Sequence, residues 1–350
     1  MITPKEQGFY MPAEWVEHRA TWLTYPHNED SWPGKIETIF PSYNLFIKTL
    51  AEVEEVHINV LDSNMQQQVA WQLQGLNAKM CNIFFHIIPS NDAWCRDHGP
   101  AFLLNKQDAS RKAIVNWNHN AWGGKYPYEK DTEIPVHIFN WIKENQDPKI
   151  ELFEPGIVME GGSIDVNGVG DLLTTTSCLL NPNRNPNLNQ NQIEEYLRNY
   201  YGVENIIWLG DGVDGDDTDG HVDDLSRFIN EDTIVTAIED NKWDENYEPL
   251  QANLKVLNQC RLANGKQPTI VELPMPDRVE WDNQRLPASY ANFYIANDRV
   301  IFPTYKCVTD NLAAYTLEEC FPDREIIGID STDIIWGLGS FHCLSQQQPK

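Results

Sequence analysis

The chain has 350 residues, which suits one large domain or two average ones, and 41% of them are hydrophobic, which argues against disorder. Its apolar runs, such as IFFHII at 83–88, are too short to span a membrane. The 52 acidic residues outnumber the 26 basic ones and give a formal net charge of −26, which repels nucleic acid and anionic lipid and favours a cationic ligand.

The chain start and the cysteines favour a cytoplasmic location. The opening MITPKEQGFY lacks a charged segment followed by an apolar one, so we expect no secretory signal. The 7 cysteines are odd in number, scattered and without a C-x-x-C pair, which is typical of reduced thiols and not of disulfides or a zinc ribbon. We therefore expect a cytoplasmic protein that binds neither nucleic acid nor membrane.

A unit of roughly sixty to seventy residues recurs along the chain, with an apolar strand, a turn, a second strand, a helix and a third strand. The chain opens with part of such a unit, a strand at 19–26, a helix near 35–52 and strands at 56–61 and 83–89. Four complete copies follow, and their predicted strands and helix lie, in order, at 97–105, 113–118, 131–145 and 150–155; 161–168, 172–180, 191–201 and 205–210; 220–230, 233–238, 245–264 and 269–274; and 289–297, 299–305, 310–320 and 325–330.

These units predict a closed radial array, because no single unit can bury its own apolar face. The C-terminal GSFHCLSQQQP (339–349) would supply the missing strand of the first unit and close the ring. An ordinary doubly wound α/β sheet is the structural alternative. The prediction is one catalytic domain over 1–350, with repeats at 19–90 closed by 335–349, at 94–155, at 160–210, at 219–275 and at 288–331.

Four short stretches carry the residues that could do chemistry, and three of them open a repeat. They are AWCRDHGP (93–100), MEGGSID (159–165), TDGHVDD (218–224) and GLGSFHCLSQQQP (337–349). In a radial array the openings of successive units meet at the axis. The candidate site is therefore Asp97, Glu160, His221, Asp223 and Cys343.

A buried cysteine or histidine by itself is more often structural, but together with three acids these residues suggest a nucleophile, an acid/base and orienting groups. Asp97 and Asp223 would each raise the pKa of the other unless a positive group lay between them. A guanidinium fits, because it is permanently charged and binds carboxylates with paired N–H groups. The acidic stretch 210–224 is not an EF-hand, since Gly220 at position six puts Ser226 at twelve, where glutamate is required.

The same motifs carry a family resemblance over nearly the whole chain. GFYMPAEWVEHRATWLTYPHNEDSWPGK (8–35), DAWCRDHGP, MEGGSIDVNG, LLTTTSCLLNPNRNP, TDGHVDD and FHCLSQQQP follow in order. The sequence resembles the branch of the guanidino-group-modifying, or pentein, superfamily that contains agmatine deiminase and bacterial peptidylarginine deiminase. The resemblance implies a five-bladed α/β propeller of ββαβ-type repeats with pseudo-fivefold symmetry, a site on its axis, and no metal or organic cofactor.

The resemblance also implies a role for each candidate residue. Asp97 and Asp223 would bind the guanidinium, and Glu160 would hold His221. His221 would be the general acid and base, and Cys343 the nucleophile. Attack by the thiolate would release ammonia and leave a covalent amidino-thioether, and water activated by His221 would then release a ureido product.

Further positions bear on the substrate. Asp217 matches an acidic position that contributes to agmatine binding in the family, and Trp94 is placed to pack against the substrate's methylene chain. The other aspartates of the acidic loop (211–219) are interpreted as solvated loop residues. Arg96 and Arg184 belong to motifs general to the branch and decide nothing. Asp165 stands where histidine is expected in agmatine deiminases, which leaves room for a sister group.

The sequence thus predicts hydrolytic deimination of agmatine to N-carbamoylputrescine and ammonia, with a small cationic guanidino substrate. A peptidyl-arginine or other guanidine deiminase is the alternative within the class. Outside it stand a cysteine peptidase, which would not explain the second guanidinium-type aspartate, and a non-catalytic polycation-binding protein, which would not need Cys343. A homodimer is left open as the assembly.

Overall fold

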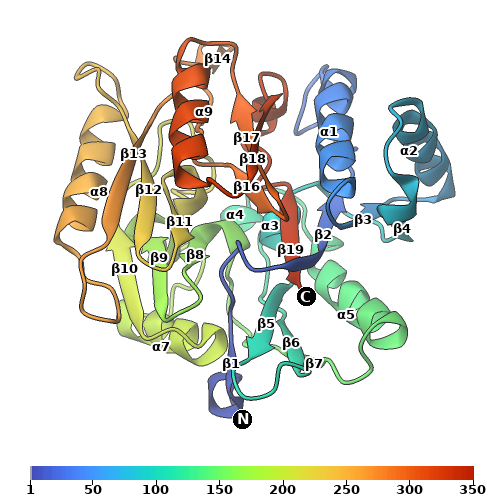
Figure 1. Cartoon of the computed structure of the whole chain (residues 1–350), viewed down its shortest axis with the longest axis horizontal. Helices are drawn as coiled ribbons and strands as arrows, with labels where there is room; N and C mark the ends of the chain where they lie inside the picture. The colour runs from blue at the N-terminus through green and yellow to red at the C-terminus, as the bar shows by residue number, and fades with distance from the viewer. Residues whose placement is uncertain (1) are drawn as a thin grey trace.

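The computed structural model describes residues 2–350, and its fold is mixed α/β, as the sequence predicts. Within that range the strands form five mixed sheets of three or four strands and one two-stranded ribbon. The alternative of a single doubly wound sheet is therefore wrong. Figure 1 shows that the long helices lie around the outside of these sheets.

One sheet joins the two ends of the chain. The C-terminal strand pairs antiparallel with the first strand of this sheet, so that Ser345 lies opposite Leu23 and Gln348 lies opposite Ala20. The sequence predicts this partnership for the segment 339–349, but the strand begins only at its second half, because the residues before it form turns. In chain order the elements are β2 His18–Thr24, α1 Ile36–Ala51, β3 Glu55–Val60, α2 Ser63–Gly75, β4 Ile83–Ile87 and β19 Ser345–Pro349.

The other four sheets repeat one pattern. The first two strands of each unit pair antiparallel, and the third pairs parallel with the second, which requires a crossover that a helix provides. The units are β5 Ala101–Asn105, β6 Lys112–Val115, α5 Ile134–Asn145 and β7 Glu151–Phe153; β8 Ile164–Val166, β9 Asp171–Thr175, α7 Gln190–Tyr201 and β10 Asn205–Leu209; β11 Ser226–Asn230, β12 Thr233–Ile238, α8 Tyr247–Gln259 and β13 Thr269–Pro274; and β16 Tyr294–Ala296, β17 Arg299–Thr304, α9 Thr309–Cys320 and β18 Glu325–Asp330.

The helix α7 shows how the sequence produces these elements. Asn189 and Gln192 form a capping box that satisfies the first backbone N–H groups of the helix. Ile193, Leu197 and Tyr201 follow at four-residue spacing and are buried against the neighbouring sheet. Truncating one such buried leucine to alanine typically costs about 2–5 kcal/mol, so this face anchors the helix.

The motif segments that open three of the units form short helical turns, where the sequence predicted strands. The predicted strand 172–180 is also shorter, because the Thr175 hydroxyl accepts the backbone N–H of Cys178 and starts a helical turn. Asp, Ser and Thr side chains bind nearby backbone groups and so compete with strand pairing, which a hydrophobic pattern does not register. These short helices are α3 Cys95–His98, η4 Gly161–Ser163, α6 Thr176–Leu179 and η5 Val222–Asp224.

Further elements have no counterpart in the sequence prediction. The glutamine-rich α2 buries only Val69 and Leu73, so its hydrophobic periodicity is weak, and Asp62 caps it by accepting two backbone N–H groups. A hairpin, β14–β15, extends from the segment between β13 and β16. The elements of this kind, besides α2, are η1 Lys5–Gln7, β1 Phe9–Tyr10, η2 Met80–Asn82, α4 Ala121–Gly124, β14 Glu280–Trp281, β15 Gln284–Arg285 and η6 Ile334–Gly337. The short helix η3 Asp131–Glu133 falls within the predicted helix 131–145, directly before α5.

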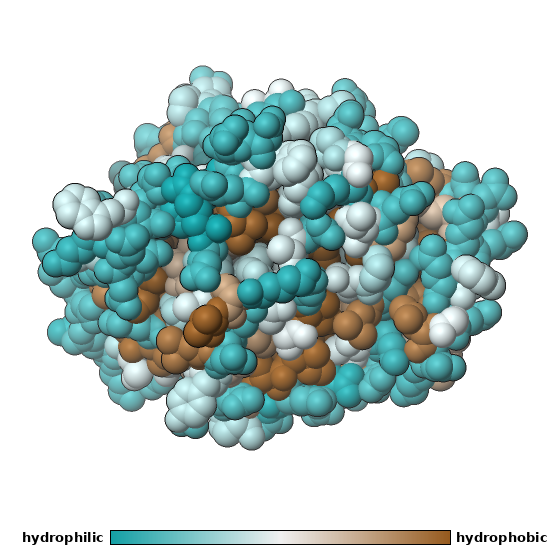
Figure 2. Space-filling model, turned by 90° about the horizontal axis from the view of Figure 1, so that it is seen from above, coloured by the Kyte–Doolittle hydropathy of each residue, from teal (hydrophilic) through white to brown (hydrophobic). Residues whose placement is uncertain are grey.

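The distribution of polar groups marks the interior as unusual. The face shown in Figure 2 is mostly hydrophilic, with hydrophobic residues recessed between polar ones. Among residues 2–350 no helix combines the length and the apolar composition that a membrane span requires. Yet Glu160, His221 and Asp223 are fully buried, at 0% exposure. Buried charges cost free energy unless they are paired, so their presence points to a functional site.

Candidate active site

Asp97, His221 and Asp223 come together around a glycine. Asp97 lies on α3, while His221 and Asp223 lie at the start of η5. A Cβ atom built on Gly162, in the turn η4, would lie 2.6 Å from His221 Nδ1 and 3.0 Å from a carboxylate oxygen of each aspartate. A larger residue would push these groups apart, so the MEGGSID motif needs glycine here for the three side chains to converge.

The Cys343 thiol lies beside the same aspartates. Its Sγ is 3.5 Å from Asp223 Oδ2 and accepts a side-chain N–H of Asn292 at 3.0 Å. Gly339 leaves room for the thiol, since a Cβ there would lie 3.2 Å from Sγ and 2.6 Å from the Trp94 ring. The Cys343 thiol, near the end of the chain, therefore lies beside the cluster of Asp97, His221 and Asp223.

The surroundings of this thiol oppose its ionisation. Burial raises the pKa of Cys343 well above its usual range, and the charges of Asp223, Asp224 and Asp97 raise it further, while the hydrogen bond from Asn292 lowers it. The thiol is therefore protonated near neutral pH in the protein alone. A cation bound among the aspartates would remove this opposition and favour the thiolate.

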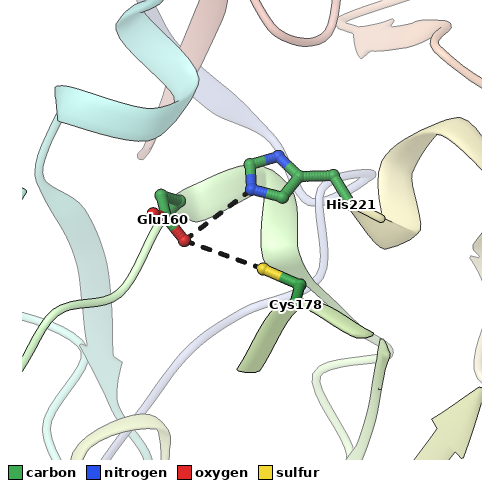
Figure 3. Close-up of side chains that lie close together, drawn as sticks. All are labelled: Glu160, Cys178 and His221. Atoms are coloured by element: carbon green, nitrogen blue, oxygen red, sulfur yellow. Dashed lines mark hydrogen bonds and ion pairs between the residues drawn. The ribbon is translucent and has the colours of Figure 1, made fainter. Parts of the chain in front are cut away.

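Glu160 lies between His221 and an arginine. Its Oε2 is 3.7 Å from His221 Nε2 and accepts the Cys178 thiol at 3.8 Å (Figure 3), and its Oε1 accepts Arg184 Nε at 2.8 Å. Burial alone would raise the pKa of Glu160, but His221 and Arg184 lower it to about 2. Burial likewise opposes the charged form of His221, but Asp97, Cys178 and Glu160 hold its pKa well above the usual range. The charged form of His221 is therefore favoured, and neither ring nitrogen has a hydrogen-bond partner within residues 2–350.

Asp97 is held by two donors. Trp122 Nε1 donates to Oδ2 and the Gly162 backbone N–H donates to Oδ1, both at 2.9 Å. Ala121 and Trp122 adopt left-handed backbone conformations, with φ of 47° and 55°. Such conformations cost about 1–3 kcal/mol each and gather at functional sites, and here they aim the indole at Asp97. The pKa of Asp97 is nevertheless raised, mainly by burial.

A cavity of about 270 Å³ leads to Asp97 and Cys343. Its wall combines aromatic rings with acidic side chains, and it contains no lysine or arginine among the described residues. A surface of this kind suits an apolar chain that ends in a cation. The aromatic and acidic residues of the wall are Asp30, Asp92, Trp94, Asp97, Trp122, Tyr126, Asp217, Trp281 and Trp336.

Both residues that the sequence assigned to the far part of the substrate line this cavity. Trp94 is 5% exposed and stacks on Trp32 with ring centroids 5.3 Å apart, so its ring orientation is set by the core. Asp217 accepts the Tyr126 hydroxyl at 2.7 Å and lies 3.3 Å from Lys125 Nζ. Its carboxylate is therefore partly neutralised, but it stays at the cavity wall.

The arginines of the motifs have internal partners. Arg96 Nη2 lies 3.1 Å from Glu14, and Arg184 binds Glu160 and Asp219. Neither arginine belongs to the cavity wall among the described residues. Neither is therefore free to bind a substrate carboxylate.

Asp165, the departure from the family pattern, is also internal. Its Oδ2 accepts Arg227 Nε at 2.5 Å and its Oδ1 accepts the Phe228 backbone N–H at 2.8 Å. It is not part of the cavity wall among residues 2–350, so the departure concerns the scaffold around the site.

Sequence reasoning missed several residues of the cluster. Trp122 stands in NAWGGKYP, where two glycines after an aromatic residue signal a special backbone. Asn292 accepts the backbone N–H groups of His342 and Cys343 and also binds the thiol, and nothing in its surrounding SYANFYIAN indicates this. Asp224 and His342 stood inside quoted motifs, but only their neighbours were given roles.

Two sets of side chains have a spacing that could hold a metal ion, since the ligand atoms of each set lie within 4.8 Å of one another. The Arg184 guanidinium touches the first set, and its charge opposes a second cation there. The sets are Glu160, Cys178 and His221, and Asp223, Asp224 and Cys343.

Comparison with known proteins identifies the family of the chain. The model of the Porphyromonas-type peptidyl-arginine deiminase family matches residues 10–349. A Legionella pneumophila protein provisionally named an agmatine deiminase is 38% identical over 99% of this chain and 97% of its own. The agmatine deiminase structure of Enterococcus faecalis has a TM-score of 0.92 at 31% identity, covering 100% of this chain and 98% of that one.

Two further structures extend the comparison. A C. jejuni agmatine deiminase variant with substrate bound has a TM-score of 0.86 at 34% identity, covering 98% of this chain and 96% of that one. A dimethylarginine dimethylaminohydrolase, 13% identical with a TM-score of 0.51, covers 94% of this chain and 99% of that one and shares the pentein fold alone. The resemblance seen in the motifs is thus confirmed. The chain belongs to the Porphyromonas-type peptidyl-arginine deiminase family, and it is a hydrolase that acts on C–N bonds of amidines.

Proposed function

We propose that the protein hydrolyses agmatine to N-carbamoylputrescine and ammonia. The observation that carries this proposal is the convergence of two buried aspartates, a histidine and a thiol, of which Asp97 and Cys343 line a cavity walled by rings and acids. A guanidinium satisfies both aspartates at once, because it is flat, permanently charged and rich in N–H donors.

The reaction begins with the guanidinium held by Asp97 and Asp223 and its carbon facing Cys343. The bound charge promotes loss of the thiol proton to solvent, and the thiolate forms an S–C bond to give a neutral tetrahedral adduct. Protonated His221 gives its proton to the departing nitrogen, the C–N bond breaks, and ammonia leaves. A positively charged amidino-thioether remains on Cys343.

The second half of the reaction uses the same histidine as a base. His221, now neutral, takes a proton from water while the hydroxide forms a C–O bond. The C–S bond then breaks, the hydroxyl proton of the adduct leaves to solvent, and the ureido product and the thiolate separate. Glu160 holds His221 in place and favours its protonated form, which prepares it for the first step.

The substrate's far end decides between agmatine and related guanidines. Agmatine ends in an ammonium group, whereas arginine adds a carboxylate and a peptide adds a backbone. Asp30, Asp92 and Asp217 line the cavity, and Arg96 and Arg184 are held by internal acids. This charge arrangement supports agmatine, with the formal charge of −26 acting in the same direction at longer range.

The test is a turnover comparison of agmatine, free arginine and a short arginine peptide, with ammonia and the ureido product measured separately. We expect agmatine to be preferred and Cys343→Ala to bind agmatine without turnover, a loss of roughly four orders of magnitude or more. Ammonia release by Cys343→Ala would exclude this nucleophile. Preference for the peptide would favour a peptidylarginine deiminase, and casein cleavage a peptidase.

We further infer that the five sheets are the blades of a single-domain α/β propeller with the site on its axis. The repeated strand pairing and the partnership of β19 with β2 support this architecture. The cysteines, which are free thiols, suit the cytoplasmic location expected from the sequence.

A further inference from the structure

His342, the neighbour of the proposed nucleophile, lies between two buried acids. Its Nδ1 is 2.6 Å from Asp223 Oδ2, and its Nε2 is 2.9 Å from Glu14 Oε2. The His342 side chain is 2% exposed, so water does not compete for these contacts. The three residues form a chain of hydrogen bonds, hereafter the Glu14–His342–Asp223 relay, that joins the start of the protein to its end.

The relay is held firmly at both ends. A carboxylate oxygen faces each ring nitrogen of His342, so the imidazole is fixed from two sides. Glu14 is in turn fixed by Arg96 at 3.1 Å, by Arg227 at 3.0 Å and by the Ile295 backbone N–H at 2.8 Å.

The relay acts on the aspartate that would meet the substrate. His342 binds Oδ2 of Asp223, the oxygen that lies 3.5 Å from Cys343 Sγ, while Oδ1 has no hydrogen-bond partner in residues 2–350. Burial would raise the pKa of Asp223, but the hydrogen bond and charge of His342, followed by the charges of His221 and Arg227, lower it. The other ionisable groups around Asp223 are Asp97, Asp224 and Cys343, each of which works against this ionisation when negatively charged.

We propose that His342 is a positioning residue: held in place by Glu14, it keeps Asp223 ionised and fixes that carboxylate beside the Cys343 thiol, where the guanidinium would bind. This proposal rests on the proposed function, because it assigns His342 a part in binding the same substrate. It differs from a purely structural role, which would change stability without changing the protonation of Asp223.

The test compares His342→Asn and Glu14→Gln with His86→Asn, which removes a buried imidazole far along the chain from the relay. His86 is on β4 and bonds to His57. For the two relay variants we expect the KM for agmatine to rise about tenfold or more with a smaller change in kcat, as befits a weakened charged hydrogen bond. The acid limb of kcat/KM should move to higher pH, because the contact with His342 that lowers the pKa of Asp223 is lost or weakened. His86→Asn should leave the limb in place.

The proposal is overturned if the acid limb of kcat/KM is unchanged in folded His342→Asn or Glu14→Gln. It is also overturned if kcat/KM falls by the same factor at every pH. If His342→Asn does not fold, Glu14→Gln decides, since it retains the shape of the relay and removes one charge.

A measurement without agmatine separates this proposal from the proposed function. It compares the rates at which a cationic haloacetamidine and neutral iodoacetamide alkylate Cys343. Loss of the cation preference in the relay variants supports the relay even if wild type fails to turn over agmatine. If the wild type turns over agmatine but the variants keep the cation preference, the relay is rejected and the proposed function stands.

Discussion

The buried centre around Asp97 and Asp223 and the acidic loop 211–219 differ in the surroundings of their negative charges. In the buried centre, Asp97 accepts hydrogen bonds from Trp122 and Gly162, and Asp223 is bound by His342. Both carboxylates lie beside Gly162. In the acidic loop, Asp211 and Asp214 are exposed, and Asp217 lies at the cavity wall. Burial makes the central charges strong and sensitive to their partners, whereas solvent screens the charges of the loop.

The loop nevertheless does more than the sequence suggested. Asp216 accepts the backbone N–H groups of Thr218, Gly220 and His221, so it shapes the turn that presents His221. Asp219, at a left-handed φ of 65°, binds Arg184, which in turn binds Glu160. The interpretation of these two aspartates as solvated loop residues is therefore wrong. The two regions differ in what their acids contact: the central acids lie beside His221 and the Cys343 thiol, whereas several acids of the loop hold the backbone and the arginine that support the centre.

The largest effect on turnover is expected when an acid of the buried centre is neutralised. Asp97→Asn retains the size of the side chain and can still accept from Trp122, but it removes half of the proposed guanidinium clamp. We expect kcat/KM for agmatine to fall by an amount equivalent to about 2–5 kcal/mol, the usual effect of breaking a buried charge pair. Steady-state kinetics beside the loop variant Asp211→Asn checks this. If Asp97→Asn and Asp211→Asn lowered kcat/KM equally, the difference between the buried centre and the loop would be contradicted.

A second, intermediate effect concerns Glu160. Glu160→Gln leaves Arg184 with Asp219 as its remaining acid, and we expect a loss of about 3 kcal/mol in the free energy of unfolding, near the low end for a broken buried pair. Because the pKa of Glu160 is lowered to about 2, its stabilising effect is present above the unfolded pKa and is lost as pH falls toward 2.

The gap between wild type and Glu160→Gln should therefore narrow on going from pH 7 to pH 3, which urea denaturation at the two values measures. The exposed Glu195→Gln is the matched control and should show little difference at either pH. A gap that stays constant with pH would refute the ionic origin of the stabilisation.

The smallest effect is expected in the loop. Asp217→Asn should raise the KM for agmatine about threefold to tenfold and leave kcat nearly unchanged, because a part-exposed charge contributes about 1 kcal/mol and is screened by salt. The difference should shrink as salt is added. The exposed Asp214→Asn, in the same loop, should leave KM unchanged, and an equal response of both variants would show that Asp217 has no special part in binding.

Local patterns in the sequence account for most of the regular structure. Runs such as TIVTAI and RVIFPT became β12 and β17 because β-branched and aromatic residues pack well on a sheet, and α7 formed because its apolar residues recur at helical spacing. The motifs likewise identified the family, because several short and unusual stretches occur together in one chain. These features depend on neighbours within one turn or one strand, which is the range over which a sequence can be read directly.

Contacts between distant segments could only be decided by the tertiary structure. The bond from Trp122 to Asp97, the contact of Asn292 with Cys343 and the place of His342 between Glu14 and Asp223 join residues brought together by the packing of separate units. The sequence determined which groups are present and which short elements carry them. Which acid meets which cation was decided by the fold, because that choice depends on distances of a few ångströms that no local pattern contains.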